Sequence, residues 1–256
     1  QKAEGWRIGL SAAEANGELL WNNAGKGVLK ADLKRLVIPA GDPGSSSASD
    51  NGSESLPGLD IRVADFSFGG KSLGGLKAVA QNRGGNWVLD SLQLTNPDGN
   101  LKGKGEWTTA GGHRTRLNFE LTAKDIGKLL ERLKIAVAVR RGTASLKGDL
   151  AWQGSLAVLH YPSLNGELWV RAEKGQFSKL EPGIGKLLGL ISLQSLPRRL
   201  ILDFRDVFSE GFAFDSIEGR LTIMNGVMRT QDKLKIDGPA ARVLIQGETD
   251  LKAETQ

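Results

Sequence analysis

The residues that most often perform catalysis are few and scattered in this sequence. Its two histidines, His113 and His160, stand in a glycine turn and before a Tyr-Pro pair, without metal-ligand or nucleophile spacing around them. Asp203 and Asp206 lie among arginines on an expected strand, where carboxylates usually form surface ion pairs. We therefore expect surface roles for all four and no catalytic residues.

Other motifs that carry chemistry are missing as well. The stretch "GGKSLGG" at 69–75 lacks the spacing of a phosphate-binding loop, and it fits a hairpin turn. There is no G-x-S-x-G nucleophile motif and no kinase motif. The chain has no cysteine, which excludes disulfides and thiolate metal sites. We predict a protein that is not an enzyme and that has no cofactor and no metal.

Composition leaves two interpretations of the charge. The 256 residues carry a net charge of +5, with both signs interspersed. This excess could attract an anionic surface or lipid headgroup, or it could be an ordinary solvated surface. No block of basic residues or nucleic-acid-binding motif appears, so we expect no nucleic-acid partner. No apolar run reaches the roughly 18 residues that a membrane-spanning helix needs.

Apolar residues alternate with polar ones over much of the chain, the pattern of a β-strand with one dry face. In "RTRLNFELTA" at 114–123, for example, every second residue from Leu117 is apolar. We expect these alternating residues to share the dry face of a sheet. They are Leu117, Phe119, Leu121, Leu168, Val170, Leu202, Phe204, Phe212, Phe214, Leu221, Ile223, Val243 and Ile245.

Turn signals separate these strands. "NRGG" at 82–85, "NPDGN" at 96–100 and "NG" at 225–226 are typical of hairpins, which join antiparallel neighbours. The expected topology is a long antiparallel meander. A glycine four residues before a large apolar residue also recurs, as in "ANGELLW" (15–21) and "LNGELWV" (164–170). Such glycines either bulge the strands so that a wide sheet curls, or merely begin them.

Three segments interrupt the strand pattern. Residues 125–133 and 184–191 place apolar side chains at helical spacing, which predicts two short amphipathic helices. Asp125 is the expected N-cap of the first, and Pro197 follows the second. Each helix could close an end of the sheet or contact a lipid surface. Residues 40–58 are small and polar, which predicts a flexible loop within a single domain over residues 1–256.

The number of strands raises the question of what covers the dry face. Residues outside the loop and helices suffice for roughly 16 strands, and an open sheet of that width usually curls or splits. It could fold into a sandwich, close as a barrel, or form a gutter that holds an apolar ligand. Irregular strand lengths argue against a membrane barrel, but the sequence pattern does not choose between sandwich and gutter.

Long stretches resemble a known family. "GKLLGLISLQSLPRRLILDFRDVFSEGFAFDSIEGRLTI" (185–223) and "LKIDGPAARVLIQGETDL" (234–251) closely resemble the C-terminal region of large members of the AsmA-like family of Gram-negative bacteria. Residues 56–107 and 121–133 are similar to the region just before it. The resemblance implies that this chain is part of a much longer protein, with a mainly β fold curled like a taco shell.

The resemblance also implies a function. Such proteins are bridge-like lipid transport proteins of the periplasm, held in the inner membrane by an N-terminal helix outside this sequence. We therefore expect a non-enzymatic module whose groove carries phospholipid acyl chains toward the outer membrane, with a lipid or protein partner there. The alternating apolar residues would line the groove. Arg198 and Arg199 would contact headgroups, or serve as partners of a helix C-terminus. The rival is a self-filled β-sandwich with a structural or adhesive role in the envelope.

Overall fold

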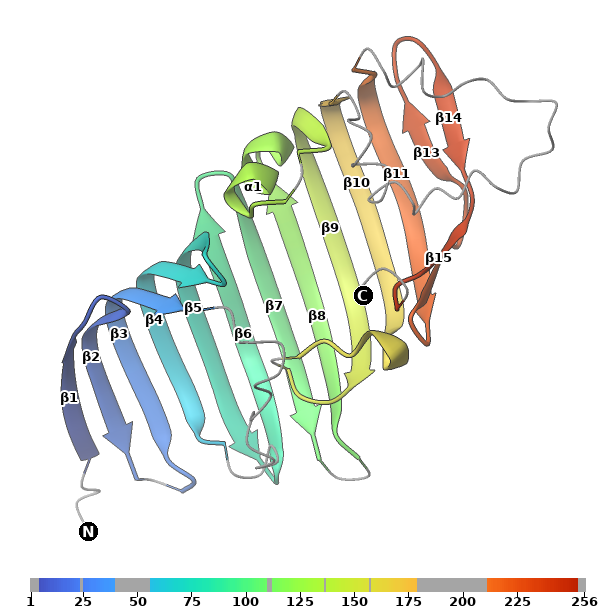
Figure 1. The fold of residues 1–256 in the computed structure, drawn as a ribbon. Helices are drawn as coiled ribbons and strands as arrows, with labels where there is room; N and C mark the ends of the chain where they lie inside the picture. The colour runs from blue at the N-terminus through green and yellow to red at the C-terminus, as the bar shows by residue number, and fades with distance from the viewer. Residues whose placement is uncertain are drawn as a thin grey trace. The chain divides into compact units, whose positions relative to one another are not determined.

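A computed structural model describes residues 5–23, 25–39, 56–109, 112–135, 137–156, 158–178 and 211–252. These residues are mainly β-strand, and the strands belong to one hydrogen-bonded sheet of 15 strands (Figure 1). The strand order follows the chain from β1 to β12. β15 then pairs with β12, while β13 pairs with β11 and β14. The mainly β fold with successive strands as neighbours is confirmed.

The chain divides into two compact units, which are described separately. Unit 1 comprises Gln1–Phe119 and Ala151–Leu159, and unit 2 comprises Glu120–Leu150 and His160–Gln256. The expectation of a single domain stays a prediction. The strands that begin in unit 1 are β1 (Gly5–Ser11), β2 (Ala15–Asn22), β3 (Val28–Ile38), β4 (Gly58–Phe68), β5 (Lys71–Arg83), β6 (Asn86–Asn96), β7 (Gly99–Thr108) and β8 (Arg114–Ala123).

One strand pair in unit 1 departs from the expected meander. β3 and β4 are parallel, in register from Val28 opposite Gly58 to Ile38 opposite Phe68. A hairpin turn can join only antiparallel strands, but a connection of about a dozen residues or more can return the chain to the same end of the sheet. The predicted loop at 40–58 occupies this connection, and its residues 40–55 lie outside the described residues.

Two glycines of the recurring motif adopt backbone that favours glycine. Gly17 and Gly166, both in the sequence Asn-Gly-Glu-Leu, have φ angles of 136° and 144°. A side chain on Gly17 would overlap the carbonyl oxygen of Asp32, and one on Gly166 would overlap that of Asp149. At Gly17 the β2–β3 register also shifts. Of the two roles left open by the sequence, the bulge is therefore confirmed at Gly17.

Alanine at these glycines should destabilise the fold. We expect Gly17→Ala and Gly166→Ala each to lower the free energy of unfolding by about 1–3 kcal/mol, because both backbone strain and overlap arise. Urea denaturation followed by circular dichroism measures this. The control is Gly9→Ala in β1, where an added Cβ meets nothing within 4 Å. Equal losses for all three variants would contradict the interpretation.

The remaining strands begin in unit 2, which also contains both described helices. Its hairpin turn at 225–226 was predicted, as were the turns at 84–85 and 97–98 in unit 1. The elements are α1 (Ile126–Arg132), β9 (Val139–Gln153), the 3₁₀-helix η2 (Tyr161–Ser163), β10 (Asn165–Phe177), β11 (Ala213–Met224), β12 (Val227–Thr230), β13 (Leu234–Asp237), β14 (Arg242–Ile245) and β15 (Glu248–Asp250).

The first predicted helix is α1. Its N-cap is Asp125, whose carboxylate accepts the backbone N–H of Lys128 at 3.0 Å. Leu129 is buried, and Ile126 packs against the main apolar cluster of unit 2. One side of α1 therefore belongs to the protein core. This agrees with the first of the two roles left open by the sequence, a helix that packs on the sheet. The second predicted helix, at 184–191, lies outside the described residues.

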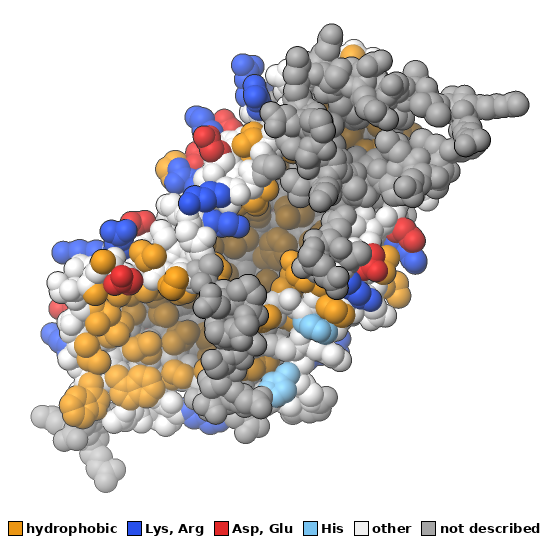
Figure 2. Space-filling view, in the orientation of Figure 1, with side chains coloured by type: hydrophobic (Ala, Val, Ile, Leu, Met, Phe, Trp, Pro, Cys, Tyr) orange, Lys and Arg blue, Asp and Glu red, His pale blue; other side chains and the backbone are white. Residues whose placement is uncertain are grey.

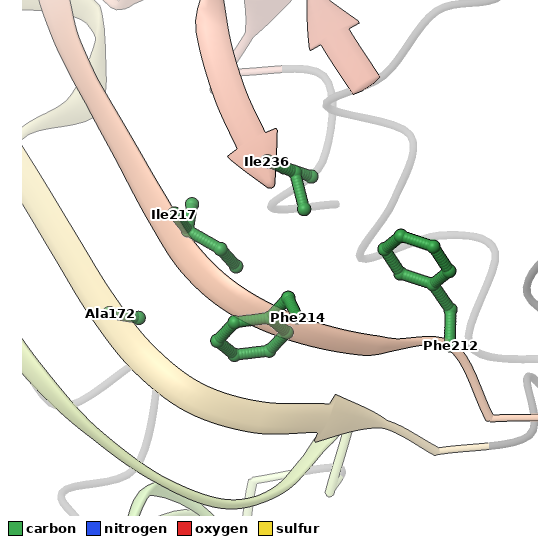
Figure 3. Packing of buried hydrophobic residues seen from close by; sticks show 5 residues of the cluster. All are labelled: Ala172, Phe212, Phe214, Ile217 and Ile236. Carbon is green, nitrogen blue, oxygen red and sulfur yellow. The ribbon is translucent and has the colours of Figure 1, made fainter. Parts of the chain in front are cut away.

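On both β10 and β11, the face of the strand that is buried changes within the strand. Ala172 and Gly175 are buried on β10, and Phe214 and Ile217 on β11. Each pair is three residues apart, so strict alternation would place its members on opposite faces. Lys174, between the buried residues of β10, has a left-handed φ of 56°. The local irregularity brings Phe214 and Ile217 into one cluster (Figure 3).

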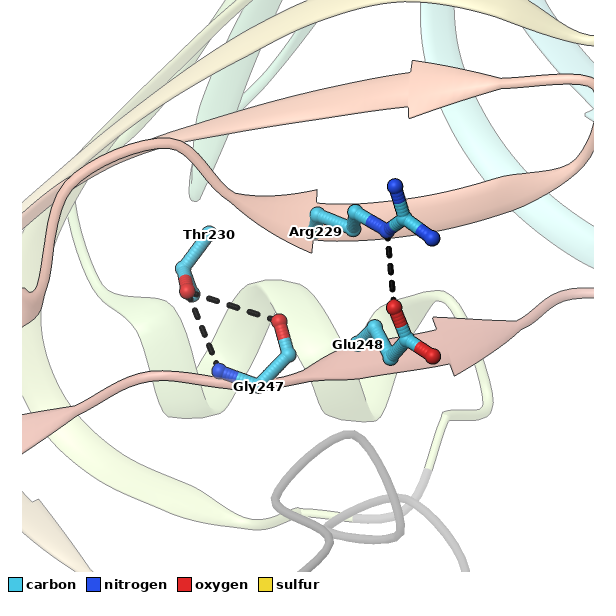
Figure 4. Close-up of polar contacts among 4 residues, drawn as sticks. All are labelled: Arg229, Thr230, Gly247 and Glu248. Carbon is cyan, nitrogen blue, oxygen red and sulfur yellow. Dashed lines mark hydrogen bonds and ion pairs between the residues drawn. The ribbon is translucent and has the colours of Figure 1, made fainter.

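β12 and β15 are joined by backbone and side-chain contacts (Figure 4). The backbone N–H of Gly247 donates to the Thr230 hydroxyl at 3.1 Å, and the Thr230 N–H donates to the Gly247 carbonyl at 3.1 Å. Arg229 pairs with Glu248 at 2.7 Å. Both of these charged side chains are exposed, so the ion pair adds at most about 1 kcal/mol. The backbone pairing therefore provides most of this connection.

Candidate functional site

The strand register of unit 1 builds one continuous apolar surface. Residues directly opposite each other on paired strands point to the same face of a sheet. Three rows of such partners cross the strands from β1 toward β7, and we call them together the apolar face. The central row is Ile8, Leu19, Ala31, Ile61, Ala78 and Leu92.

The two flanking rows contain only apolar side chains and glycine. With strands about 4.8 Å apart, a row that crosses seven strands is about 29 Å long, comparable to the roughly 30 Å of a bilayer's hydrocarbon core. One flanking row is Leu10, Gly17, Leu33, Val63, Leu76, Leu94 and Leu101. The other is Trp6, Trp21, Leu29, Leu59, Ala80, Leu89 and Gly105.

The opposite face of the same strands carries most of the charged side chains, with a few apolar ones such as Leu20 and Val79 among them. Asp32 is opposite Arg62, Arg62 is opposite Lys77, and the row continues through Gln93 to Lys102. Each of these residues follows or precedes a residue of the apolar face along its own strand. The sheet of unit 1 therefore separates an apolar surface from a charged one.

Exposure of the apolar face varies along its length. On the edge strand β1, Trp6 is 70% exposed and Ile8 is 49% exposed. On β3, Ala31 and Leu33 are buried against their neighbours. Figure 2 shows hydrophobic side chains gathered over the first strands of unit 1, turned toward the viewer. The apolar face is therefore more exposed on β1 than on β3.

Connecting segments cover the apolar face near β5 and β6. Trp87 and Leu89 are buried, with Leu56 and Leu156 from segments outside the strands packed against their cluster. The Trp87 indole N–H donates to the carbonyl of Pro57 at 3.0 Å. Leu56 lies just before β4 in the sequence, and Leu156 lies just after β9. Protein side chains therefore occupy this part of the surface.

Most of the apolar face was not singled out by the sequence analysis. The signal was present, because "WRIGL" (6–10) and "GLDIRV" (58–63) alternate as clearly as the chosen stretches. What sequence could not supply was the register, which places Ile8 and Ile61 in one row across a parallel strand pair.

In unit 2, two of the predicted lipid-contacting residues lie in a protein core. Phe212 and Phe214 are 5% and 2% exposed, in a cluster with Ala172, Ile217 and Ile236 (Figure 3). The rings of Phe214 and Phe177 lie 5.2 Å apart between centroids. Side chains of the chain itself surround Phe214.

The other predicted residues are distributed over both units. Leu117 and Phe119 in unit 1 are half-buried, as is Leu121 in unit 2. Leu168 lies opposite Leu221, and both are half-buried. Four predicted residues, Leu202, Phe204, Arg198 and Arg199, lie outside the described residues. The remaining ones are the half-buried Val170, the buried Ile223, and Val243 and Ile245, which pack against the Phe214 cluster.

No group of His, Cys, Asp and Glu side chains suited to a metal ion occurs among the described residues. The His113 ring lies 6.1 Å from that of Trp107, and the His160 Nδ1 lies 2.7 Å from the Ser163 hydroxyl. In the part of the chain that the structure describes, no helix has the length and apolar character to cross a bilayer. Among the described residues, the apolar face of unit 1 is therefore the candidate functional site.

These features define a β-sheet protein that presents an extended apolar surface. The sequence model described as "YhdP protein" matches residues 1–256. The chain therefore belongs to the YhdP family, which confirms the resemblance drawn from residues 185–223. It is 31% identical over 197 residues to "Intermembrane phospholipid transporter YhdP" of Escherichia coli (strain K12).

That match covers 76% of this chain but only 16% of the relative, so the chain spans about a sixth of that protein's length. No solved structure matches the chain. The function in the relative's name belongs to a much longer molecule.

Proposed function

We propose that this chain is a lipid-transfer module, whose apolar face carries the acyl chains of phospholipids. The observation that carries the proposal is the set of three uninterrupted apolar rows, whose side chains Trp6 and Ile8 on β1 are exposed. The relative's name, an intermembrane phospholipid transporter, supports the choice of phospholipid as the substrate class. The module needs no catalytic residue, because a lipid that moves along a surface keeps all its bonds.

The rows suit movement as well as binding. Burying a methylene group stabilises it by about 0.8 kcal/mol wherever the surface is apolar. If each step along a row exchanges one apolar contact for a similar one, the free energy of the lipid stays nearly level. Leu19, Ile61 and Leu92 offer such equivalent contacts at alternate positions of the central row, with the smaller but also apolar Ala31 and Ala78 between them. The headgroup would remain at the wet border of the sheet.

The setting follows from the same proposal. The parent protein would be anchored in the inner membrane and cross the periplasm, with this chain close to the outer membrane or a protein there. Arg198 and Arg199, which lie outside the described residues, would contact headgroups. The remaining predicted residues of unit 2, such as Leu168 and Leu221, would contact acyl chains within unit 2.

The rival function, a structural envelope module without lipid, is favoured by one observation. Phe214 is 2% exposed, and its cluster is filled by the chain's own side chains. In this rival, the apolar face of unit 1 would likewise be covered by protein.

Lipid extraction separates the two functions. The full 256-residue chain is purified without detergent and extracted with organic solvent, and the extract is analysed by mass spectrometry. We expect phospholipid in a fixed ratio to protein, enriched over a control protein prepared in parallel. An extract without phospholipid would favour the structural module and contradict the proposed function.

A further inference from the structure

Basic residues concentrate around α1 and the start of β9. Between residues 124 and 141 the sequence has six Lys or Arg residues and two acidic ones, in a chain of net charge +5. Five of them, which we call the α1 basic patch, are exposed. Figure 2 shows Lys and Arg side chains around the place that α1 occupies in Figure 1. The patch is Lys124, Lys128, Lys134, Arg140 and Arg141.

Close packing of α1 on β9 makes this patch continuous. A Cβ on Gly127 would lie 3.2 Å from the Cα of Arg140 and 3.4 Å from the backbone N of Arg141. A side chain at this position would be tightly packed against the backbone of β9. The backbone on either side of Gly127, including Lys128, is therefore held next to Arg140 and Arg141. Charges from a helix and a strand are combined on one surface of unit 2.

The patch is not neutralised within the described part of the chain. None of its five residues forms an ion pair there, whereas Arg83 and Arg171 elsewhere pair with Asp90 and Glu218. The nearest acidic residue in sequence, Asp125, is engaged as the helix N-cap. Unpaired like charges repel each other, so the patch would gain from an anionic partner.

Two patch residues occupy backbone that usually favours glycine. Lys134 ends α1 with φ 52°, and Arg141 has φ 58°. The N–H of Lys134 donates to Glu131 O and that of Ile135 to Leu130 O, each at 2.9 Å, which is the Schellman pattern of a helix end. Glycine is the usual residue at the Lys134 position. Glycine substitutions at Lys134 and Arg141 would therefore remove charge while relieving backbone strain.

We propose that the α1 basic patch docks this chain onto the surface of an anionic phospholipid bilayer. Ile135, next to Lys134, is 39% exposed. Basic residues beside an exposed apolar side chain are the composition of elements that lie in the membrane interface. Phosphates attract the cations, and Ile135 enters the boundary between headgroups and acyl chains. This docking site does not depend on the acyl-chain proposal, since it lies on other residues and binds another part of the lipid.

Vesicle flotation tests the docking site. The full chain is mixed with neutral vesicles of phosphatidylcholine, or with anionic vesicles that also contain about 30% phosphatidylglycerol. The patch variant is Lys134→Gly with Arg141→Gly, which removes two charges where glycine fits the backbone better. The control, Lys77→Gln with Lys102→Gln, removes two exposed charges from the polar face of unit 1. Both variants have the same net charge.

We expect the parent chain to float with anionic vesicles only, and the patch variant to lose roughly tenfold or more in partitioning. The control should bind like the parent, and 1 M salt should abolish binding. Equal losses in both variants, or no binding of the parent, would overturn the site. Equally tight binding of duplex DNA would overturn the lipid assignment. If the patch variant melts earlier than the parent, Lys124→Gln with Lys128→Gln is measured in its place.

Discussion

Replacing Leu76 with aspartate is expected to abolish phospholipid loading of the chain. Leu76 lies opposite Val63 and Leu94 in a flanking row of the apolar face. An acyl chain that covers this position would strip water from the new carboxylate, which costs several kcal/mol. We expect bound phospholipid, measured by mass spectrometry of solvent extracts, to fall about tenfold or more.

The adjacent residue provides the control. Lys77 follows Leu76 on β5 and faces the polar side, opposite Arg62 and Gln93. Lys77→Asp therefore places the same carboxylate on the same strand but outside the proposed path, and lipid content should stay at the parent level. Circular dichroism establishes that both variants are folded. Parental lipid content in a folded Leu76→Asp variant would remove this row from the path.

Replacing Phe214 with alanine is expected to give the largest loss of stability. The side chain is 2% exposed and packs with Phe177 and Ile217 in the core of unit 2. Truncating a buried phenylalanine costs about 3–5 kcal/mol, from lost burial and the cavity that remains. The midpoint of urea denaturation, combined with its slope, gives the change in the free energy of unfolding.

A control variant on the same strand shows whether the loss of stability in Phe214→Ala comes from burial of the side chain. Met224 ends β11 and is 65% exposed, so Met224→Ala should cost less than about 1 kcal/mol. A large difference between the two variants would establish Phe214 as protein core, in line with its burial. If both variants lose equally little, the Phe214 ring is not held by protein neighbours, and it becomes available to a guest acyl chain.

Local patterns predicted local structure well. The alternation in residues 114–123 became β8, the capped helical spacing after Asp125 became α1, and the glycine pair at 84–85 became a hairpin turn. In each case the deciding interactions lie within a few residues of each other. The chemistry of the backbone and the solvent is sufficient to choose the structure at that range.

Relations across the sheet could not be predicted in the same way. Parallel pairing of β3 with β4 depends on a long connection, whose path no turn residue specifies. The left-handed backbone at Lys174, on the strand paired with the segment between Phe214 and Ile217, occurs at a residue that is not glycine. The burial of Phe212 and Phe214 could not be predicted from alternation, and the rows through Ile8 and Ile61 emerged only from the register.

Photo-crosslinking at alternating positions tests the central claim most directly. A benzophenone amino acid is placed at Ile8 or Ile61 on the apolar face, and at Arg7 or Arg62 on the opposite face. The full chain is irradiated in cells, and phospholipid adducts are identified by mass spectrometry. The proposed function predicts adducts at Ile8 and Ile61, and none at Arg7 and Arg62. Adducts of equal yield on both faces, or no adduct at any position, would contradict it.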